Sequence, residues 1–207
     1  MIKGAPFVFV IDDDAAIREA LDGLIRSIQL NVQTFGTTNE FLEFSLPDVP
    51  GCIVLDVRLP GMNGLDFQHE LTKLGINLPI IFITGHGDVP MSVRAIKSGA
   101  IEFLTKPFRD QELIDAIYLG IDRDQARRQA VAVFSDIQAR FALLTPREQV
   151  IMREVITGRP NKKIAASLKL SEFTVKLHRS HVMRKMQASS LVDLVRMADT
   201  LQIVTTA

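Results

Sequence analysis

Hydrophobic residues follow two spacings in residues 1–120, and their alternation predicts strands separated by helices. Five short runs are apolar almost throughout, as strands buried on both faces of a parallel sheet are. These runs are 7–11, 32–35, 52–57, 79–84 and 101–104. Helical spacing lies between and after them, near 17–28, 38–45, 64–74 and 89–98 and from Asp110 onward. Five strand-helix units predict a flavodoxin-like, doubly wound α/β domain.

Helix-ending signals refine one of these elements. Asp88 is a suitable N-cap for the helix at 89–98, because its carboxylate can accept hydrogen bonds from the free amides of the first turn. Gly99 follows the helix and can adopt the left-handed backbone that ends many helices.

After residue 121 the pattern is helical only. Residues 122–141 contain neither glycine nor proline and place Asp124 four residues before Arg128, so they predict a helix that prolongs the fifth one. Thr145, Pro146 and Glu148 then predict an N-cap, an N1 proline and a capping box. Further helices are expected at 161–168, at 172–186 with Ser171 as N-cap, and at 189–201. We therefore predict an α/β domain at 1–120, a helical linker at 121–141 and an all-α, four-helix domain at 142–207.

The net charge of zero hides an asymmetry between the two halves. Residues 1–120 carry 16 Asp and Glu against 9 Lys and Arg, whereas residues 121–207 carry 8 against 15. The halves thus have net charges of −7 and +7, and the basic half is compatible with nucleic-acid binding. Two short helices, a tight turn and a basic helix within it predict a helix-turn-helix.

Other features of composition narrow the class of protein. The sequence has no apolar run of the roughly 18 residues that a membrane span needs, and its N-terminus does not resemble a signal peptide. The single cysteine, Cys52, lies in an apolar run and is expected to be a core residue. A chain with one cysteine suits a reducing compartment, so we expect a cytoplasmic protein.

Polar residues stand at the ends of the predicted strands. Asp12 and Asp13 follow the first strand, Asp56 ends the third, Thr84 ends the fourth, and Lys106 follows the fifth. Because parallel strands end at one edge of the sheet, these side chains should gather there. Clustered carboxylates favour a hard divalent cation, Mg²⁺ or Mn²⁺, while Lys106 and Thr84 could hold phosphoryl oxygens. Asp56 then becomes a candidate nucleophile that accepts a phosphoryl group.

The segments DDD, LDVRLPGMNG, ITGHGDVP and EFLTKPF resemble a two-component response-regulator receiver domain. The resemblance implies that Asp56 is the phosphoacceptor and that Asp12 and Asp13 form the acidic pair. It implies that Asp13, Asp56 and the backbone carbonyl of Arg58 bind the metal. The remaining implied features are contacts of Thr84 and Lys106 with the phosphoryl group, Phe103 as an aromatic switch, and a cis Lys106–Pro107 peptide.

Residues 144–187 resemble a LuxR-type helix-turn-helix. The whole chain resembles the NarL/FixJ subfamily, closer to FixJ, over about 5–118 and 143–200. In the helix 172–186, the residues expected to face inward are Val175, Val182 and Met186, and those expected to face largely outward are Lys176, His178, Arg179, Arg184 and Lys185. The resemblance implies base-edge contacts by Lys176 and Leu177, with Ser180 one turn further on. It implies phosphate contacts by Asn161, Lys162, Thr174 and Lys185. Lys169 stands in the turn where the family usually has glycine.

The function expected from these features is that of a phosphorylation-activated transcriptional regulator and not of an enzyme. Its expected partners are a sensor histidine kinase, promoter DNA, a second copy of the chain after phosphorylation, and RNA polymerase. One alternative is a phosphatase that forms a phosphoaspartate, but that class has an acid two residues after its nucleophile, where this chain has Arg58. Another alternative is a stand-alone signalling adaptor that acts through protein contacts. The predicted helix-turn-helix argues against this alternative.

Overall fold

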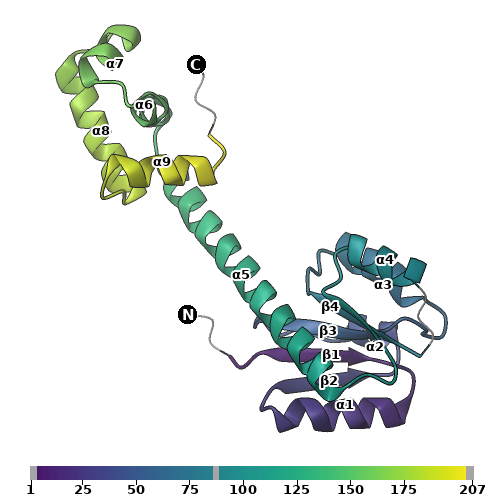
Figure 1. The fold of residues 1–207 in the computed structure, drawn as a ribbon. Coiled ribbons are helices and arrows are strands. Elements are labelled where there is room, and N and C mark those ends of the chain that lie inside the picture. The colour runs from purple at the N-terminus through teal and green to yellow at the C-terminus, as the bar shows by residue number, and fades with distance from the viewer. Residues whose placement is uncertain (1–3, 86–88, 204–207) are drawn as a thin grey trace. The chain divides into compact units, whose positions relative to one another are not determined.

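The structure is a computed structural model that describes residues 4–85 and 89–203 (Figure 1). The chain divides into two compact units, which we call the N-terminal unit, residues 1–128, and the C-terminal unit, residues 129–207. The division lies inside the stretch 121–141 that the sequence predicts as a linker. It also lies inside a single helix, so the helix itself belongs to both units.

A five-stranded parallel sheet forms the centre of the N-terminal unit. The strands are β1 (Phe7–Ile11), β2 (Asn31–Phe35), β3 (Gly51–Asp56), β4 (Ile80–Thr84) and β5 (Glu102–Thr105). Their order in the sheet is β2-β1-β3-β4-β5. This is the flavodoxin-like order, so the predicted fold class is confirmed, with strand boundaries within one residue of those expected.

Helices cover both faces of this sheet (Figure 1). They are α1 (Ala15–Ser27), α2 (Thr38–Glu43), α3 (Gly64–Lys73), α4 (Val89–Lys97) and α5 (Asp110–Ala142). On one face α1 and α5 pack against alternate strand residues such as Val10 and Val54. On the other face α2, α3 and α4 pack against their neighbours, such as Ile11 and Leu55. The alternation follows from the two-residue repeat of a strand, which sends successive side chains to opposite faces.

The position of each strand in the sheet explains its burial. β3 and β4 are buried throughout because both have neighbours on either side and helices on both faces. Cys52 in β3 has no exposed surface, which raises the pKa of its thiol and confirms it as a core residue. β5 lies at the edge of the sheet and is partly exposed. The burial on both faces that its apolar sequence predicted is therefore wrong for this strand.

The ends of α4 and α5 bear on two predictions. The expected N-cap of α4, Asp88, lies outside the described residues. Gly99 adopts a positive φ of 94° just after α4, as the prediction of a helix end requires. α5 runs without interruption over 33 residues, which confirms that residues 122–141 prolong the fifth helix.

Four helices follow α5 in the C-terminal unit: α6 (Pro146–Ile156), α7 (Asn161–Leu168), α8 (Glu172–Met186) and α9 (Leu191–Thr200). The capping box of α6 is present, with Thr145 and Glu148 each bonded to the other's backbone amide. Ser171 caps α8, as predicted. Lys169 ends α7 with φ 53° and ψ 48°, so this lysine occupies the left-handed region that glycine favours, at a cost of roughly 1 kcal/mol.

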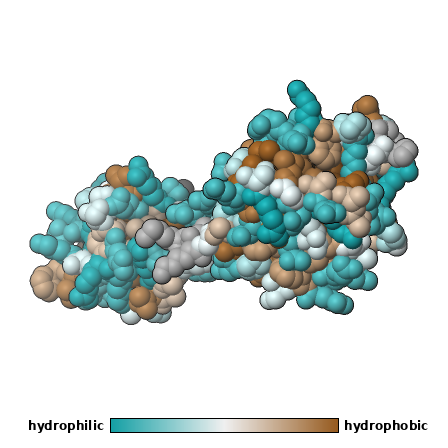
Figure 2. All heavy atoms as spheres, turned by 90° about the horizontal axis from the view of Figure 1, so that it is seen from below, coloured by the Kyte–Doolittle hydropathy of each residue, from teal (hydrophilic) through white to brown (hydrophobic). Residues whose placement is uncertain are grey.

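The C-terminal unit has its own hydrophobic core, to which all four of these helices and the last turns of α5 contribute. None of the helices in the described parts of the chain combines the length and apolarity that crossing a membrane requires. The face drawn in Figure 2 is mostly hydrophilic, with separate hydrophobic patches. Each unit thus has a buried core of its own.

A buried carboxylate anchors the part of α5 that belongs to the N-terminal unit. Asp124 has no exposed surface and accepts hydrogen bonds from the amide of Gly51 at 3.1 Å and from Arg128 Nε at 2.6 Å. The same carboxylate forms a second ion pair, with Arg127 Nη2 2.6 Å from Asp124 Oδ1. The predicted Asp124–Arg128 pair is therefore present, and it is joined to the start of β3.

Replacing this carboxylate should destabilise the N-terminal unit. Asp124→Asn keeps the shape of the side chain but removes the charge that both arginines share, so we expect unfolding to become easier by about 1–3 kcal/mol. The only tyrosine, Tyr118, lies in this unit, so its fluorescence during urea unfolding reports this unit alone. The exposed Asp115→Asn on the same helix is the control. Equal midpoints for the two variants would contradict the anchoring role.

Candidate functional site

The carboxyl ends of the central strands bring four predicted site residues together. Asp12 follows β1, Asp56 is the last residue of β3, Thr84 the last residue of β4, and Lys106 follows β5. Because the strands are parallel, all four stand at one edge of the sheet. The sequence prediction of a polar cluster at this edge is confirmed by position.

Lys106 connects the two buried carboxylates of the cluster. Its Nζ lies 2.6 Å from Asp12 Oδ2 and 3.3 Å from Asp56 Oδ2. Asp12 is completely buried, and Asp56 is 7% exposed. Burying two carboxylates side by side costs free energy through desolvation and repulsion, which the shared ammonium group offsets.

Local hydrogen bonds fix the orientation of Asp12. Its Oδ1 accepts from the amide of Asp14 at 2.9 Å, and its backbone carbonyl accepts from Arg18 Nη1 at 2.6 Å. Burial raises the pKa of Asp12 above its ordinary value, although hydrogen bonds from Lys106 and from the Asp14 amide oppose the shift. The turn after β1 is thus built to hold one carboxylate inside the sheet edge.

Asp13 completes a group of three carboxylates that could hold a cation. One oxygen each from Asp12, Asp13 and Asp56 lies within 4.8 Å of the other two. Asp13 is exposed and also lines a hollow formed with residues 57–63, so the group is open to solvent on that side. Oxygen-only ligands with solvent access fit a hard ion such as Mg²⁺, which usually keeps several of its waters.

The loop after β3 approaches Asp56 closely. The amide of Arg58 donates to Asp56 Oδ1 at 3.2 Å, and Arg58 and Asn63 form an isolated antiparallel bridge. At Gly64, a β-carbon would stand only 2.6 Å from the backbone carbonyl of Asp56. The glycine therefore lets α3 begin directly beside the candidate nucleophile.

Thr84 ends β4, the strand next to β3, and Phe103 lies on β5, one strand further from Asp56. Thr84 is completely buried, and its carbonyl accepts from the amide of Lys106 at 2.7 Å. Phe103 is partly buried, with its ring centroid 6.3 Å from that of Phe82. The Lys106–Pro107 peptide is cis, as the resemblance implied.

One local role in this region was not predicted. Asp14 was assigned no chemical role from the sequence, and it caps α1 by accepting from the amide of Ala16 at 2.8 Å. An aspartate directly before a helical pattern is itself an N-cap signal that would have identified it.

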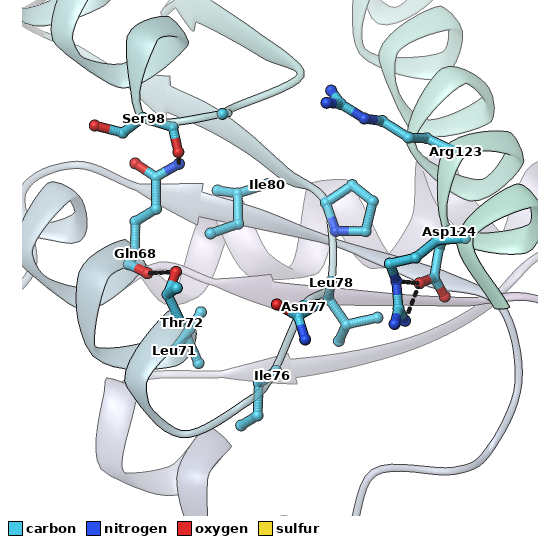
Figure 3. A pocket seen from close by; sticks show the side chains of 13 residues that line it. Gln68, Leu71, Thr72, Ile76, Asn77, Leu78, Ile80, Ser98, Arg123 and Asp124 are labelled. Atoms are coloured by element: carbon cyan, nitrogen blue, oxygen red, sulfur yellow. Dashed lines mark hydrogen bonds and ion pairs between the residues drawn. The ribbon is translucent and has the colours of Figure 1, made fainter. Parts of the chain in front are cut away.

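A second hollow lies at the opposite, amino-terminal edge of the sheet (Figure 3). Gln68, Asn77, Ser98 and Arg123 are among its lining residues, and it shares no residue with the acidic cluster.

In the C-terminal unit, α8 presents exposed polar residues to solvent. Val175, Val182 and Met186 are fully buried, which confirms the predicted inward face. Among the predicted DNA contacts, those on the exposed surface are Lys162, Lys176, Leu177 and Ser180. Phe173 is 77% exposed in the first turn of α8, and no sequence pattern had marked it as a surface residue.

Three basic residues of α8 are less exposed than predicted. His178, Arg179 and Lys185 are only partly exposed, because each turns towards another helix or its cap. Arg179 Nη1 donates to Asn161 Oδ1 at 3.1 Å. Lys185 Nζ lies 2.6 Å from Glu148 Oε2. Of the predicted phosphate contacts, Asn161 and Lys185 therefore already have intramolecular partners, as does Thr174, whose Oγ1 lies 2.7 Å from Ser171 Oγ.

Glu148 is the buried acid of this unit. Its side chain is 4% exposed and accepts from Lys185 Nζ and from the Thr145 amide at 2.8 Å. Burial by itself would raise the pKa of Glu148, but the hydrogen bonds from Lys185 and Thr145 outweigh it and lower the pKa to about 2. The sequence marked Glu148 only as part of a capping box, since its ionic partner lies 37 residues away.

Because the pKa of Glu148 is lowered in the folded state, the C-terminal unit should lose stability as the solution becomes acidic. The unfolded carboxyl should titrate near its ordinary value of 4.5, so the ionised form stabilises the fold fully above that pH. This contribution is lost as the pH falls from 4.5 through 2. Comparing the wild type with Glu148→Gln, we expect the difference in free energy of unfolding to be at most roughly 3 kcal/mol near neutral pH and to shrink towards zero at pH 2.

Urea unfolding followed by NMR cross-peaks from α6 and α8 measures this difference for the C-terminal unit alone. Glu172→Gln, an exposed glutamate in the first turn of α8, is the control and should show no comparable loss. A stability difference for Glu148→Gln that does not change between pH 7 and pH 3 would contradict the assignment.

Two sequence families match the chain. The family described as the response regulator receiver domain matches residues 8–118. The family described as bacterial regulatory proteins, luxR family, matches residues 142–198. Together they account for both units, and the receiver family alone spans more than half of the chain.

Individual relatives share the whole arrangement. Nodulation protein W of Bradyrhizobium diazoefficiens is 55% identical over 196 residues, which cover 95% of this chain and 86% of the relative. The transcriptional regulatory protein FixJ of the same organism is 43% identical over 192 residues, covering 92% and 93%. The solved structure of the response regulator StyR is 46% identical, covers 95% of this chain and 99% of that chain, and superposes with a TM-score of 0.85.

The strand-end cluster and the helix-turn-helix thus occur in a chain that is similar to response regulators over nearly its whole length. No helix, strand or site described above conflicts with that assignment. The chain belongs to the two-component response regulators that join a receiver domain to a LuxR-type DNA-binding domain and act as transcription factors.

Proposed function

We propose that Asp56 accepts a phosphoryl group from a sensor histidine kinase and that this modification activates DNA binding by the C-terminal unit. The observation that carries the proposal is the geometry around Asp56. A carboxylate at a strand end, almost buried, lies beside a lysine and two further aspartates. An isolated structural carboxylate would need neither the acidic neighbours nor the shared ammonium group.

The chemistry follows from these neighbours. An Asp56 carboxylate oxygen attacks phosphorus, the bond from phosphorus to the donor's histidine nitrogen breaks, and an acyl phosphate remains on Asp56. Lys106 carries positive charge next to the oxygens that gain negative charge. A Mg²⁺ or Mn²⁺ ion held by Asp13, Asp56 and the Arg58 carbonyl, with Asp12 behind them, would offset the remaining charge of the phosphoryl group.

Arg58 also distinguishes this proposal from the phosphatase alternative. A phosphatase of the phosphoaspartate type needs an acid at this position to protonate the leaving group. Arg58 cannot supply a proton at neutral pH, since a guanidinium group stays charged. The modification should therefore persist as a signal and not be an intermediate of rapid turnover.

Thr84 and Phe103 are the proposed link from the site to the surface. A phosphoryl group on Asp56 would offer oxygens that attract the Thr84 hydroxyl as a hydrogen-bond donor. Phe103, partly buried on the neighbouring strand, would then rotate inward. The two positions of the ring would give the receiver two surfaces around α4 and β5.

These surfaces favour pairing of two receivers. α4 exposes Val89, Val93 and Ile96, which are spaced by four and three residues and so share one helix face. An exposed apolar stripe of this kind is typical of a contact surface. We propose that phosphorylation produces a dimer through α4 and β5, and that the paired chains bind a two-fold related promoter site and contact RNA polymerase in the cytoplasm.

For DNA, α8 is the proposed recognition helix. Its exposed residues Lys176, Leu177 and Ser180 are the proposed base-edge contacts, since an α-helix fits the major groove. Asn161, Lys162, Thr174 and Lys185 are the proposed phosphate contacts. Lys185 would have to share its ammonium group between a phosphate and Glu148, so its contribution should be smaller than that of Lys162.

Asp56→Asn should abolish phosphorylation, because the amide keeps the shape of the side chain but is not a nucleophile. We expect no labelling from acetyl phosphate or from a histidine kinase with Mg²⁺, measured by phosphate-affinity electrophoresis and by mass spectrometry. Asp66→Asn, an exposed position in the first turn of α3, is the control and should be labelled normally. Undiminished labelling of Asp56→Asn would rule out the assignment.

Lys176→Ala should weaken specific DNA binding by about 1–3 kcal/mol if the side chain contacts a base edge. The measurement uses the phosphorylated full-length chain and the fragment that it selects from genomic DNA, at one fixed salt concentration. Arg196→Ala on α9, an exposed arginine outside the helix-turn-helix, is the control. Equal losses on selected and random DNA would identify Lys176 as a phosphate contact and contradict base reading.

A further inference from the structure

Three metal-ligating side chains of the C-terminal unit meet between α6 and α8. His178 and His181 are three residues apart on α8 and so lie on one face of that helix. Glu148 approaches them from the first turn of α6. One donor atom of each lies within 4.8 Å of the other two. This group is separate from the acidic cluster of the receiver and has different chemistry, with two nitrogen donors and one oxygen donor.

The spacing suits a small tetrahedral ion. Glu148 Oε1 and His181 Nδ1 are 3.5 Å apart. Two ligands of a tetrahedral zinc ion, each about 2.1 Å from the metal, stand about 3.4 Å from each other. The pair therefore already has the separation that the ion requires, and the His178 ring has to move only a short way to join it.

Two of the three ligands have a donor atom that is not used in a hydrogen bond within the described part of the chain. Glu148 uses Oε2 for Lys185 and for the Thr145 amide, which leaves Oε1 turned towards His181. His178 Nδ1 is buried and has no hydrogen-bond partner in the described part of the chain. A buried ring nitrogen without a partner costs free energy, and a metal ion at this site would remove that cost if it drew this nitrogen in.

The charge at the site is also suitable. Glu148 is ionised at neutral pH, and metal binding requires an ionised carboxylate and neutral imidazoles. Lys185 lies on the other carboxylate oxygen and offsets part of the negative charge, so the affinity should be moderate. Nitrogen donors select against Mg²⁺ and in favour of ions of the zinc, copper and nickel type.

We propose that Glu148, His178 and His181 form a binding site for a transition-metal ion, Zn²⁺ foremost, with water in the fourth position. The ion would connect the start of α6 to the middle of α8 and so stabilise the C-terminal unit. The proposal concerns metal binding alone and does not depend on phosphorylation of Asp56 or on the DNA contacts of α8.

The test uses the full-length chain in excess Mg²⁺, which keeps the receiver cluster occupied. Co²⁺ is added as a spectroscopic substitute for zinc, because a four-coordinate site with nitrogen donors gives much stronger visible absorption than an octahedral oxygen site. We expect one equivalent of Co²⁺ to give these bands and Zn²⁺ to abolish them. His181→Gln should weaken binding at least about tenfold. His69→Gln, an exposed histidine on α3, is the matched control and should bind like the wild type.

Equal Co²⁺ affinity of His181→Gln and the wild type would overturn the proposal, as would the absence of four-coordinate bands from the wild type. If His181→Gln fails to fold, NMR of the wild-type chain tests whether the metal binds at this site. The ring-nitrogen NMR signals of His178 and His181 should then shift on addition of Zn²⁺ while those of His69 do not. Unshifted signals from His178 and His181 would contradict the site.

Discussion

The ion pair of Lys106 with Asp12 and Asp56 is the interaction on which the receiver site depends. Two carboxylates buried side by side at the sheet edge would repel each other strongly without a neighbouring positive charge. Lys106, in the loop after β5, supplies that charge. The consequence is a constraint on topology. Strands β1, β3 and β5 must end at the same edge for three residues so far apart in sequence to meet, and the parallel order provides this.

The C-terminal unit also contains a buried carboxylate that is paired with a lysine. Glu148 is buried, receives Lys185 from α8 and bonds the cap of α6 with the same oxygen. One carboxylate thereby joins the start of one helix to the end of another. Asp124 does the same for α5 and the start of β3. In each place a buried acid fixes how two elements approach, because removing either partner would leave a charge without compensation.

The sequence was a good guide wherever a local pattern determines the structure. Apolar runs located the strands to within one residue, and capping residues such as Thr145 and Ser171 located helix starts. The gathering of Asp12, Asp56 and Lys106 followed from the topology of a parallel sheet. The metal ligands and DNA contacts could only be inferred by resemblance, because ligands and partners leave no periodic signal.

What the sequence missed depends on long-range packing. The partial burial of Lys185 and Arg179 could not be read from α8, since their partners Glu148 and Asn161 lie on other helices. The exposure of β5 depends on its place at the edge of the sheet, which composition does not reveal. Local rules predict elements, whereas the partner of a long side chain is decided by how those elements pack.

The burial of Cys52 has a practical consequence for studying this regulator in solution. The chain has one cysteine, it has no exposed surface, and its thiol is harder to ionise than usual. A thiolate is the species that reacts with maleimides and similar reagents, so the folded chain should be inert to them. Cysteines introduced at exposed positions could then carry fluorescent or spin labels selectively, without first removing the native residue from the centre of β3.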